Sequence, residues 1–158
     1  MIKQIQASDL ERCLSVIRES FATVAKEFNL TEQNCPTHTS FTKIEKLEYR
    51  MEIGNFMYGY FDNGGIVGYV SLEDKGGGVF ELKNLAVLPE YRHKGFGAQL
   101  LGFCKEKARE LGGSKITIDI IEENTVLKDW YAASGFVHTG TKTFGHLPFT
   151  AGYMECRV

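Results

Sequence analysis

The sequence lacks long apolar runs and lacks the spacings that bind metals. Its uninterrupted apolar stretches are only a few residues long, far below the roughly 18 that a membrane-spanning helix needs. The four cysteines, Cys13, Cys35, Cys104 and Cys156, stand far apart, with no CxxC pair and no histidine at metal-ligand spacing. We therefore expect reduced cysteines, with no metal site and no membrane partner.

An excess of one charge is also absent. The chain has 18 lysines and arginines against 20 aspartates and glutamates, which gives a net charge of −2. Such a balance excludes a global field that attracts nucleic acid or anionic lipid, so any basic patch must be local. Met1 leads directly into a predicted strand without an apolar signal segment. These features predict a cytoplasmic protein with no nucleic-acid partner.

The composition that is present is that of a globular protein. Hydrophobic residues make up 43% of the chain and charged residues 24%, which is typical of a folded domain. At 158 residues the chain is long enough to bury a core. No linker, repeat or low-complexity tract divides it, so we expect a single domain over residues 1–158.

Hydrophobic periodicity predicts a mixed sheet with packed helices. Ser8 and Glu11 have capping-box spacing, and an apolar stripe at helical spacing then continues to about residue 28. Further helices are predicted over about 40–53, 97–111 and 126–133. Strands are predicted over 2–5, 55–61, 66–72, 79–87, 115–121, 136–143 and 152–157. The resulting order, βααβββαβαββ, indicates an α/β fold of the α+β type.

Residues 91–98, YRHKGFGA, carry the strongest functional pattern. They connect the strand at 79–87 to the helix at 97–111, and this loop delivers the helix N-terminus to the carboxyl edge of the sheet. Free N–H groups and the helix dipole attract anions there. Gly95 and Gly97 allow the backbone to approach a ligand closely, while Arg92 and Lys94 add positive charge. The loop therefore predicts a phosphate or pyrophosphate site.

Other phosphate-binding motifs fit less well. No GxxxxGK[ST] sequence exists, which excludes a P-loop. A dinucleotide fingerprint would use Gly95, Gly97 and Asp119, but Leu100 occupies the third glycine position and Asp119 falls in mid-strand. The loop from Val87 is also too long for that turn. A solvated basic turn before a helix is the remaining structural alternative.

The longer segment LAVLPEYRHKGFGAQLL resembles the acyl-CoA signature R/Q-x-x-G-x-G/A of the GNAT superfamily of N-acetyltransferases. Downstream, Asn124 followed by Trp130, Tyr131, Gly135 and Phe136 looks like the family's second cofactor-side motif. Together these motifs cover about residues 79–137. The resemblance implies a central, mostly antiparallel sheet, a splayed parallel pair formed by the strands at 79–87 and 115–121, and about four flanking helices.

The resemblance also implies acetyl-CoA as cosubstrate, with no metal. The pantetheine arm is expected to pair with the backbone of Leu85, Ala86 and Val87 like an added strand, and the Val87 N–H to bind the thioester oxygen. Asn124 and Tyr131 are expected to contact the cofactor as well. The residues expected to hold the pyrophosphate are Arg92, His93, Lys94, Gly95, Phe96, Gly97 and Ala98.

The reaction implied is direct attack by a neutral primary amine in a ternary complex. Tyr131 matches the family's general acid near the sulfur, and Glu81 matches a base position on the same strand face as Val87. An ordinary glutamate is too weak a base for an ammonium, so Glu81 would need desolvation or a water relay. Asp119 and His146 are alternative bases. Trp130 is expected in the core.

The resemblance does not determine the acceptor, which we expect to be a small amine, an amino acid or a peptide N-terminus. Its pocket is expected from residues 29–38, the second helix and the loop at 143–150, with few carboxylates. The aromatic candidates are Tyr49, Tyr58, Phe144, His146 and Phe149.

Two further interpretations concern the whole molecule. The row Lys43, Lys46 and Arg50 is interpreted as a solvated helix face, and the terminal strand can pair across a homodimer. A non-catalytic acyl-CoA-binding sensor or interaction module is the alternative function, although the intact glycines and Tyr131 favour an enzyme.

Overall fold

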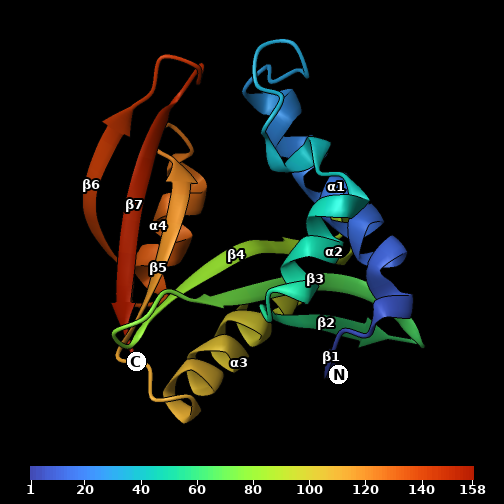
Figure 1. Ribbon diagram of the computed structural model, residues 1–158. Coiled ribbons are helices and arrows are strands. Elements are labelled where there is room, and N and C mark those ends of the chain that lie inside the picture. Colours follow the sequence, from blue (N-terminus) through green and yellow to red (C-terminus); the bar gives the residue numbers. More distant parts are fainter.

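One seven-stranded sheet, in the order β1-β2-β3-β4-β5-β7-β6, runs through the molecule (Figure 1). The computed structural model describes residues 1–158. Every neighbouring pair of strands is antiparallel except β4 and β5, which are parallel. The strands are β1 (Ile2–Gln4), β2 (Phe56–Asp62), β3 (Gly65–Asp74), β4 (Val79–Val87), β5 (Lys115–Ile121), β6 (Val137–Thr143) and β7 (Thr150–Arg157).

Four α-helices pack on this sheet, α1 (Leu10–Glu27), α2 (Ile44–Glu52), α3 (Phe96–Glu110) and α4 (Thr125–Ala133). Helices α1 and α2 lie on one face of β2–β4, and α3 crosses the other face (Figure 1). Short 3-10 turns precede α1 (η1, Ala7–Asp9), α2 (η2, Thr39–Phe41) and α3 (η3, Pro89–Tyr91). None of the helices combines the length and the hydropathy that crossing a bilayer demands.

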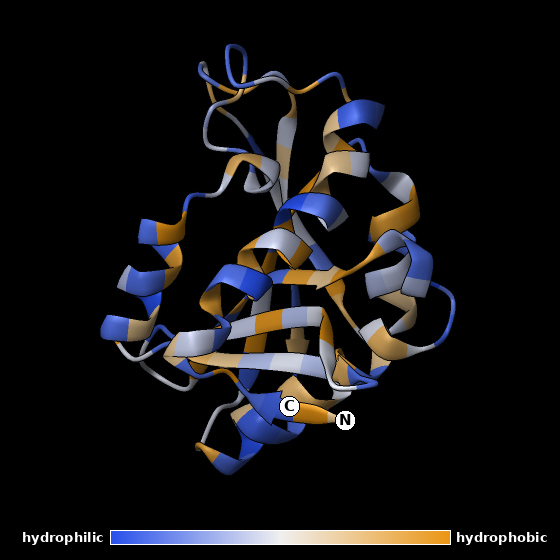
Figure 2. Ribbon diagram, turned by 90° about the vertical axis from the view of Figure 1, so that its right-hand side faces the viewer, coloured by the Kyte–Doolittle hydropathy of each residue, from blue (hydrophilic) through white to orange (hydrophobic).

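The core lies between the sheet and the inward faces of the helices. Figure 2 shows hydrophobic residues on the strands and on the helix sides turned toward them. The apolar stripe predicted for the first helix is buried at Cys13 and Ile17, and that of α3 at Leu100 and Cys104. All four cysteines are free and buried. Burial raises the pKa of the Cys13 and Cys104 thiols to about 12, so both behave as small hydrophobic groups.

The predicted element order and the mixed sheet with its splayed parallel pair are confirmed. The capping box at Ser8 and Glu11 is wrong. The chain already turns at Ala7, and the Asp9 carboxylate accepts a hydrogen bond of 2.8 Å from the Gln6 N–H. Asp9, and not Glu11, is therefore the acidic residue that accepts from a free backbone N–H at the start of the helical segment, that of Gln6.

The second predicted helix, 40–53, is divided into η2 and α2. Thr42 has extended backbone angles (φ −55°, ψ 137°), which interrupt the helical path. Its carbonyl oxygen accepts a 2.7 Å hydrogen bond from Arg18 Nε of α1. This long-range bond satisfies a buried carbonyl that a continuous helix would have used internally.

Gly113, between α3 and β5, lies where a side chain has no room. A Cβ atom there would lie 2.7 Å from the Ala108 carbonyl oxygen and 2.8 Å from the Phe80 ring. We expect Gly113→Ala to lower the free energy of unfolding by about 1–3 kcal/mol, because the backbone and the ring must shift. Urea unfolding measures the change. Gly102→Ala is the control, since nothing lies within 4 Å of its Cβ position inside α3. It should stabilise by up to about 1 kcal/mol, and equal effects of the two variants would contradict the steric argument.

Candidate active site

Strands β4 and β5 pair only where they begin. The paired residues are Val79 with Lys115, Phe80 with Ile116 and Glu81 with Thr117. Both strands continue beyond these pairs, β4 to Val87 and β5 to Ile121. The two strands therefore diverge, and backbone groups of both lose their partner across the gap.

A β-bulge at Asn84 accompanies this divergence. Tyr69 of β3 pairs with Ala86 and Ser71 with Lys83, so one residue of β3 opposes two of β4. Asn84 has a left-handed φ of 55°, which asparagine tolerates better than most residues. A bulge bends its strand, and here it falls between the paired and the unpaired halves of β4. The bulge was not predicted, although an asparagine inside a strand with apolar residues is a sequence signal for such an irregularity.

Beyond the bulge, the backbone of Val87 faces the gap. The Leu88 N–H donates a 2.9 Å hydrogen bond to the Val67 carbonyl oxygen on the β3 side. Because successive strand residues direct their polar groups to opposite sides, the Val87 N–H and C=O point away from β3. By the same alternation, Ala86 faces β3 and contributes no free backbone group to the gap.

A cavity of about 620 Å³ opens between the diverging strands, α1, α3 and α4. Of the predicted site residues, Ala86, Lys94 and Glu81 are not among those that line it. The predicted residues that line it are Leu85, Val87, Arg92, His93, Gly95, Phe96, Gly97, Ala98, Asn124 and Tyr131. The structure thus brings ten of the thirteen predicted residues to one wall or another of the same space.

The loop before α3 presents a row of free amides to this cavity. The Tyr91 and Arg92 N–H groups close the η3 turn by donating to Leu88 and Pro89. The six N–H groups from His93 to Ala98 donate no hydrogen bond within the protein. His93 (φ 63°) and Gly95 (φ 84°) adopt left-handed conformations that turn these amides inward. Together with the positive end of α3, they form a concave anion site.

The basic side chains of this loop do not contribute as predicted. Arg92 donates to the Ser20 carbonyl oxygen (2.8 Å), to Ser20 Oγ (3.3 Å) and to Thr23 Oγ1 (3.2 Å), so its guanidinium ties the loop to α1. Lys94 Nζ lies 5.0 Å above the Tyr91 ring. The anion site is therefore built from backbone, and Arg92 positions it against the helix.

Helix α4 supplies the opposite wall. Asn124 caps it, with Oδ1 accepting from the Leu127 N–H at 3.2 Å. Trp130 was predicted to be a core residue, but it lines the cavity, and its indole lies 3.7 Å from the Cβ position of Gly97. Two aromatic contacts hold the Tyr131 ring, with Trp130 at 5.0 Å and Phe136 at 5.3 Å. Burial raises the pKa of Tyr131 well above its usual range, so the phenol keeps its proton.

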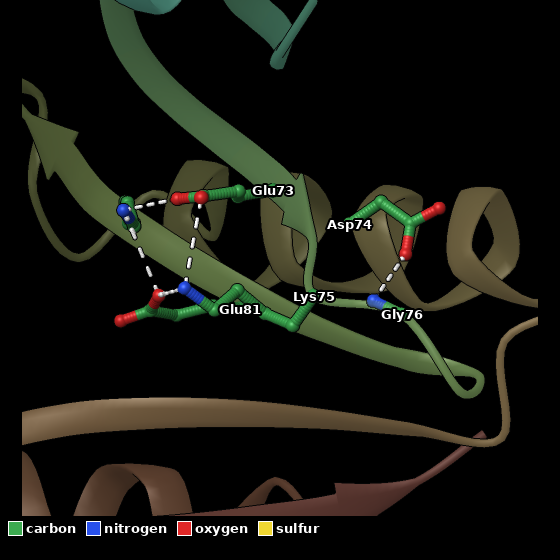
Figure 3. A network of polar contacts seen from close by, with 6 residues as sticks. Glu73, Asp74, Lys75, Gly76 and Glu81 are labelled. Atoms are coloured by element: carbon green, nitrogen blue, oxygen red, sulfur yellow. Dashed lines mark hydrogen bonds and ion pairs between the residues drawn. The ribbon is translucent and has the colours of Figure 1, made fainter.

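Glu81, the base expected from the resemblance, lies in an ion-pair network outside the cavity. Figure 3 shows Glu73 of β3 and Glu81 of β4 reaching toward the same lysines. Glu81 Oε2 lies 3.6 Å from Lys83 Nζ and 3.8 Å from Lys75 Nζ, and Lys83 also donates to Glu73. Its carboxylate is paired on the sheet face, and Glu81 is not among the residues that line the cavity.

Asp119 is the acidic residue of β5 that lines the cavity. Burial, and secondly the charge of Glu81, raise the pKa of this carboxyl above its usual range, while Lys83 and Lys75 oppose the shift. His146 lies in the exposed loop before β7, against Phe144, and is not a cavity residue. Among the three bases that the sequence left open, Asp119 therefore has the best position.

None of the five aromatic residues expected around the acceptor lines the cavity. Tyr49 is exposed on α2, and Tyr58 is buried against Phe103 with ring centres 4.8 Å apart. Phe149 packs into a small apolar cluster with Leu30 and Ile121. Helix α1 forms a wall of the cavity instead, through Phe21, Val24 and Glu27. Helical spacing marked Phe21 and Val24 as core, and nothing in the sequence showed which helix faces the gap.

Two diverging parallel strands beside a helix N-terminus with free amides form the arrangement that the resemblance implied. Residues 21–136 match the acetyltransferase (GNAT) family, which is more than half of the chain. The chain belongs to this family.

Individual relatives agree with this assignment. The chain is 26% identical over 153 residues to an uncharacterized N-acetyltransferase of the pepI 3′ region in Lactobacillus delbrueckii subsp. lactis, covering 90% of this chain and 87% of the relative. PaiA N-acetyltransferase from Thermoplasma acidophilum, crystallised with coenzyme A, is 24% identical with a TM-score of 0.77, covering 100% and 98%. The ribosomal-protein-S18-alanine N-acetyltransferase of Escherichia coli is 15% identical with a TM-score of 0.77, covering 100% and 93%.

The raised pKa of Asp119 predicts a pH-dependent stability effect. A carboxyl whose folded pKa exceeds its unfolded pKa binds its proton more tightly when folded, so its ionisation lowers stability as pH rises through that range. We expect Asp119→Asn to raise the melting temperature at neutral pH, with the difference vanishing at about pH 3, where the wild-type carboxyl is protonated. Thermal unfolding across pH measures it, with Asp129→Asn on exposed α4 as control. A constant difference at every pH would contradict this assignment.

Proposed function

We propose that the protein is an acetyl-CoA-dependent N-acetyltransferase that acts on a primary amine by direct attack in a ternary complex. The observation that carries the proposal is the row of six free amides, His93 to Ala98, beside the gap between β4 and β5. Membership of the acetyltransferase family and the coenzyme A complex of a structural neighbour support it. Release of CoA thiol over a panel of amines tests it. Tight acetyl-CoA binding with no release would favour a non-catalytic acyl-CoA-binding module.

The cavity walls fit the parts of acetyl-CoA in sequence. The amides from His93 to Ala98 bind the diphosphate. The backbone of Leu85 and Val87 faces the gap and pairs with the amide groups of the pantetheine arm, as an added strand would. Asn124 and Trp130 form the opposite wall. The Val87 N–H, directed into the gap, donates to the thioester oxygen and binds it more strongly as that oxygen gains charge.

Two proton transfers complete the reaction. The amine nitrogen bonds to the thioester carbon, the C–S bond breaks, and the sulfur leaves with the bonding electrons. Tyr131 delivers its proton to that sulfur. Burial disfavours the phenolate, but it disfavours a thiolate in the same site as well, so the transfer accompanies bond breaking. The amine attacks in its neutral form, and the proton that its nitrogen sheds as the amide forms goes to Asp119. That proton then passes from Asp119 to the Tyr131 phenolate, which restores both residues, and the products are the amide and CoA thiol.

Asp119 replaces Glu81 as the proposed base because it lines the cavity. Its raised pKa makes it a stronger base than an ordinary aspartate. Glu81 acts through Asp119, since its negative charge is the second cause of that shift. Both the burial and the second carboxylate therefore favour proton uptake at Asp119.

Gly97 leaves room for the ligand at the start of α3. Its Cβ position lies 3.7 Å from Trp130 and 3.8 Å from Val87, so a large side chain would project into the space between them. We expect Gly97→Trp to abolish acetyl-CoA binding in calorimetry while the protein stays folded. Gly102→Trp, about one and a half turns further along α3 with open space around it, is the control. Undiminished affinity in Gly97→Trp would refute the placement of the cofactor.

Tyr131 should matter for turnover and not for cofactor affinity. Tyr131→Phe keeps the ring contacts with Trp130 and Phe136 and removes only the hydroxyl group, which carries the proton. We expect kcat to fall by about 10²–10⁴-fold, with the acetyl-CoA dissociation constant nearly unchanged. Steady-state kinetics and calorimetry separate the two effects. Tyr49→Phe, on exposed α2, is the control, and normal turnover in Tyr131→Phe would remove the hydroxyl from the mechanism.

A further inference from the structure

Four buried side-chain atoms that can form hydrogen bonds have no partner within the protein. They are Asn84 Nδ2, Arg50 Nη1, Asn55 Nδ2 and Tyr69 Oη. Buried polar groups are normally hydrogen-bonded, so each such atom needs an explanation. Of the four residues, Asn84 alone lines the cavity. Its amide is therefore the unsatisfied group that a ligand in the cavity can satisfy.

Asn84 stands on β4 between the paired part of the strand and the open part. The last residue pair with β5, Glu81 with Thr117, lies three residues before it, and Val87 lies three residues after it. A cofactor whose diphosphate lies on the free amides of residues 93–98 runs back along β4 from there, so it reaches Val87 first and Asn84 next. The Asn84 amide therefore lies toward the end of the cofactor that carries the acyl group.

The parts of β4 and β5 next to Asn84 contribute apolar side chains to the cavity. Leu82 of β4 and Ile118 and Ile120 of β5 line it, and they are 5%, 2% and 7% exposed. An amide donor without a partner is costly in such surroundings, and a hydrogen bond to it is electrostatically stronger than one in water. This part of the wall is therefore suited to bind an oxygen atom that accepts a hydrogen bond.

The backbone of the β-bulge does not by itself call for this side chain. Asn84 has a φ of 55°, a left-handed conformation that glycine adopts without strain. No hydrogen bond of Nδ2 fixes the amide group. A rotation about the Cβ–Cγ bond that directs Nδ2 to a ligand therefore breaks no bond that this nitrogen makes within the protein.

We propose that Asn84 Nδ2 donates a hydrogen bond to the thioester carbonyl oxygen of acetyl-CoA, beside the Val87 N–H. This inference rests on the proposed acetyltransferase function. Three strand residues span at most about 10 Å, a distance that an asparagine side chain and two hydrogen bonds of about 2.9 Å each can cover. One oxygen can therefore accept from both groups. As the amine bonds to the thioester carbon, this oxygen gains negative charge and both donors bind it more strongly.

The carbonyl stretching frequency of bound acetyl-CoA tests this contact without turnover. A hydrogen bond to a carbonyl oxygen weakens the C=O bond and lowers its stretching frequency. With carbon-13 at the thioester carbonyl, we expect the infrared band to lie at a higher frequency in Asn84→Gly than in the wild-type protein. Asn63→Gly is the matched control, because Asn63 is exposed in the turn between β2 and β3 and has a similar left-handed φ of 50°. An unchanged band in Asn84→Gly would overturn the proposal.

Calorimetry and kinetics separate the thioester from the rest of the cofactor. CoA keeps both pantetheine amides but lacks the thioester. We expect Asn84→Gly to raise the acetyl-CoA dissociation constant about two- to tenfold and to leave that of CoA unchanged. Its kcat should fall about 10²–10³-fold. Equal weakening of the two ligands would instead assign the donor to a pantetheine amide and contradict the thioester contact.

A second variant keeps the test independent of the glycine substitution. Asn84→Asp retains the shape of the side chain and replaces the donor with an acceptor. It should shift the infrared band and lower kcat as Asn84→Gly does, and thermal unfolding shows whether each variant is folded. If the wild-type protein binds acetyl-CoA but acetylates no amine, the proposed function fails while the infrared comparison still tests Asn84. An active enzyme whose band responds to neither variant would reject the contact and leave the function in place.

Discussion

The separation of β4 from β5 is the constraint on which the rest of the site depends. Three residue pairs hold the strands together, and the bulge at Asn84 then turns β4 away. A continuous sheet would have satisfied the backbone of Leu85 and Val87 internally and closed the cavity. The fold instead leaves polar backbone groups unpaired between two strands whose other edges pair with β3, apart from the bulge, and with β7. Groups left free in this way are satisfied by water or by a ligand.

The polar groups of the sheet face are divided by their access to this gap. Glu73, Lys75, Glu81 and Lys83 pair among themselves where β3 and β4 are still in register. Asp119, which lies beyond the last paired residues, has no such partner. The same strand separation that opens the cavity therefore decides which carboxylates are paired within the protein and which one is left without an ion pair. The strand separation therefore determines both the backbone geometry and the charge distribution around the cavity.

Local sequence patterns predicted the fold well. The site was harder to predict, because it depends on how elements that are distant in the sequence face one another. Short-range signals predicted individual elements correctly. The apolar stripe that contains Cys13 and Ile17 predicted a helix, and the glycines at 95 and 97 predicted the loop before α3. The partner of the Arg92 guanidinium lies 72 residues away on α1, and that of Glu81 depends on the register of a hairpin. No local pattern carries such information. The contacts of Arg92 and Glu81, and the identity of the helix that lines the cavity, could not be predicted from the sequence for this reason.

The hydrogen bonds from Arg92 to Ser20 and Thr23 have a consequence for how this scaffold can diversify. They fix the axis of α1 relative to the amide row through backbone and hydroxyl acceptors. Phe21 and Val24 occupy other positions of the same helix and contribute apolar side chains to the cavity. Substitutions at those two positions can therefore change the shape of the cavity while Arg92 keeps the helix in place.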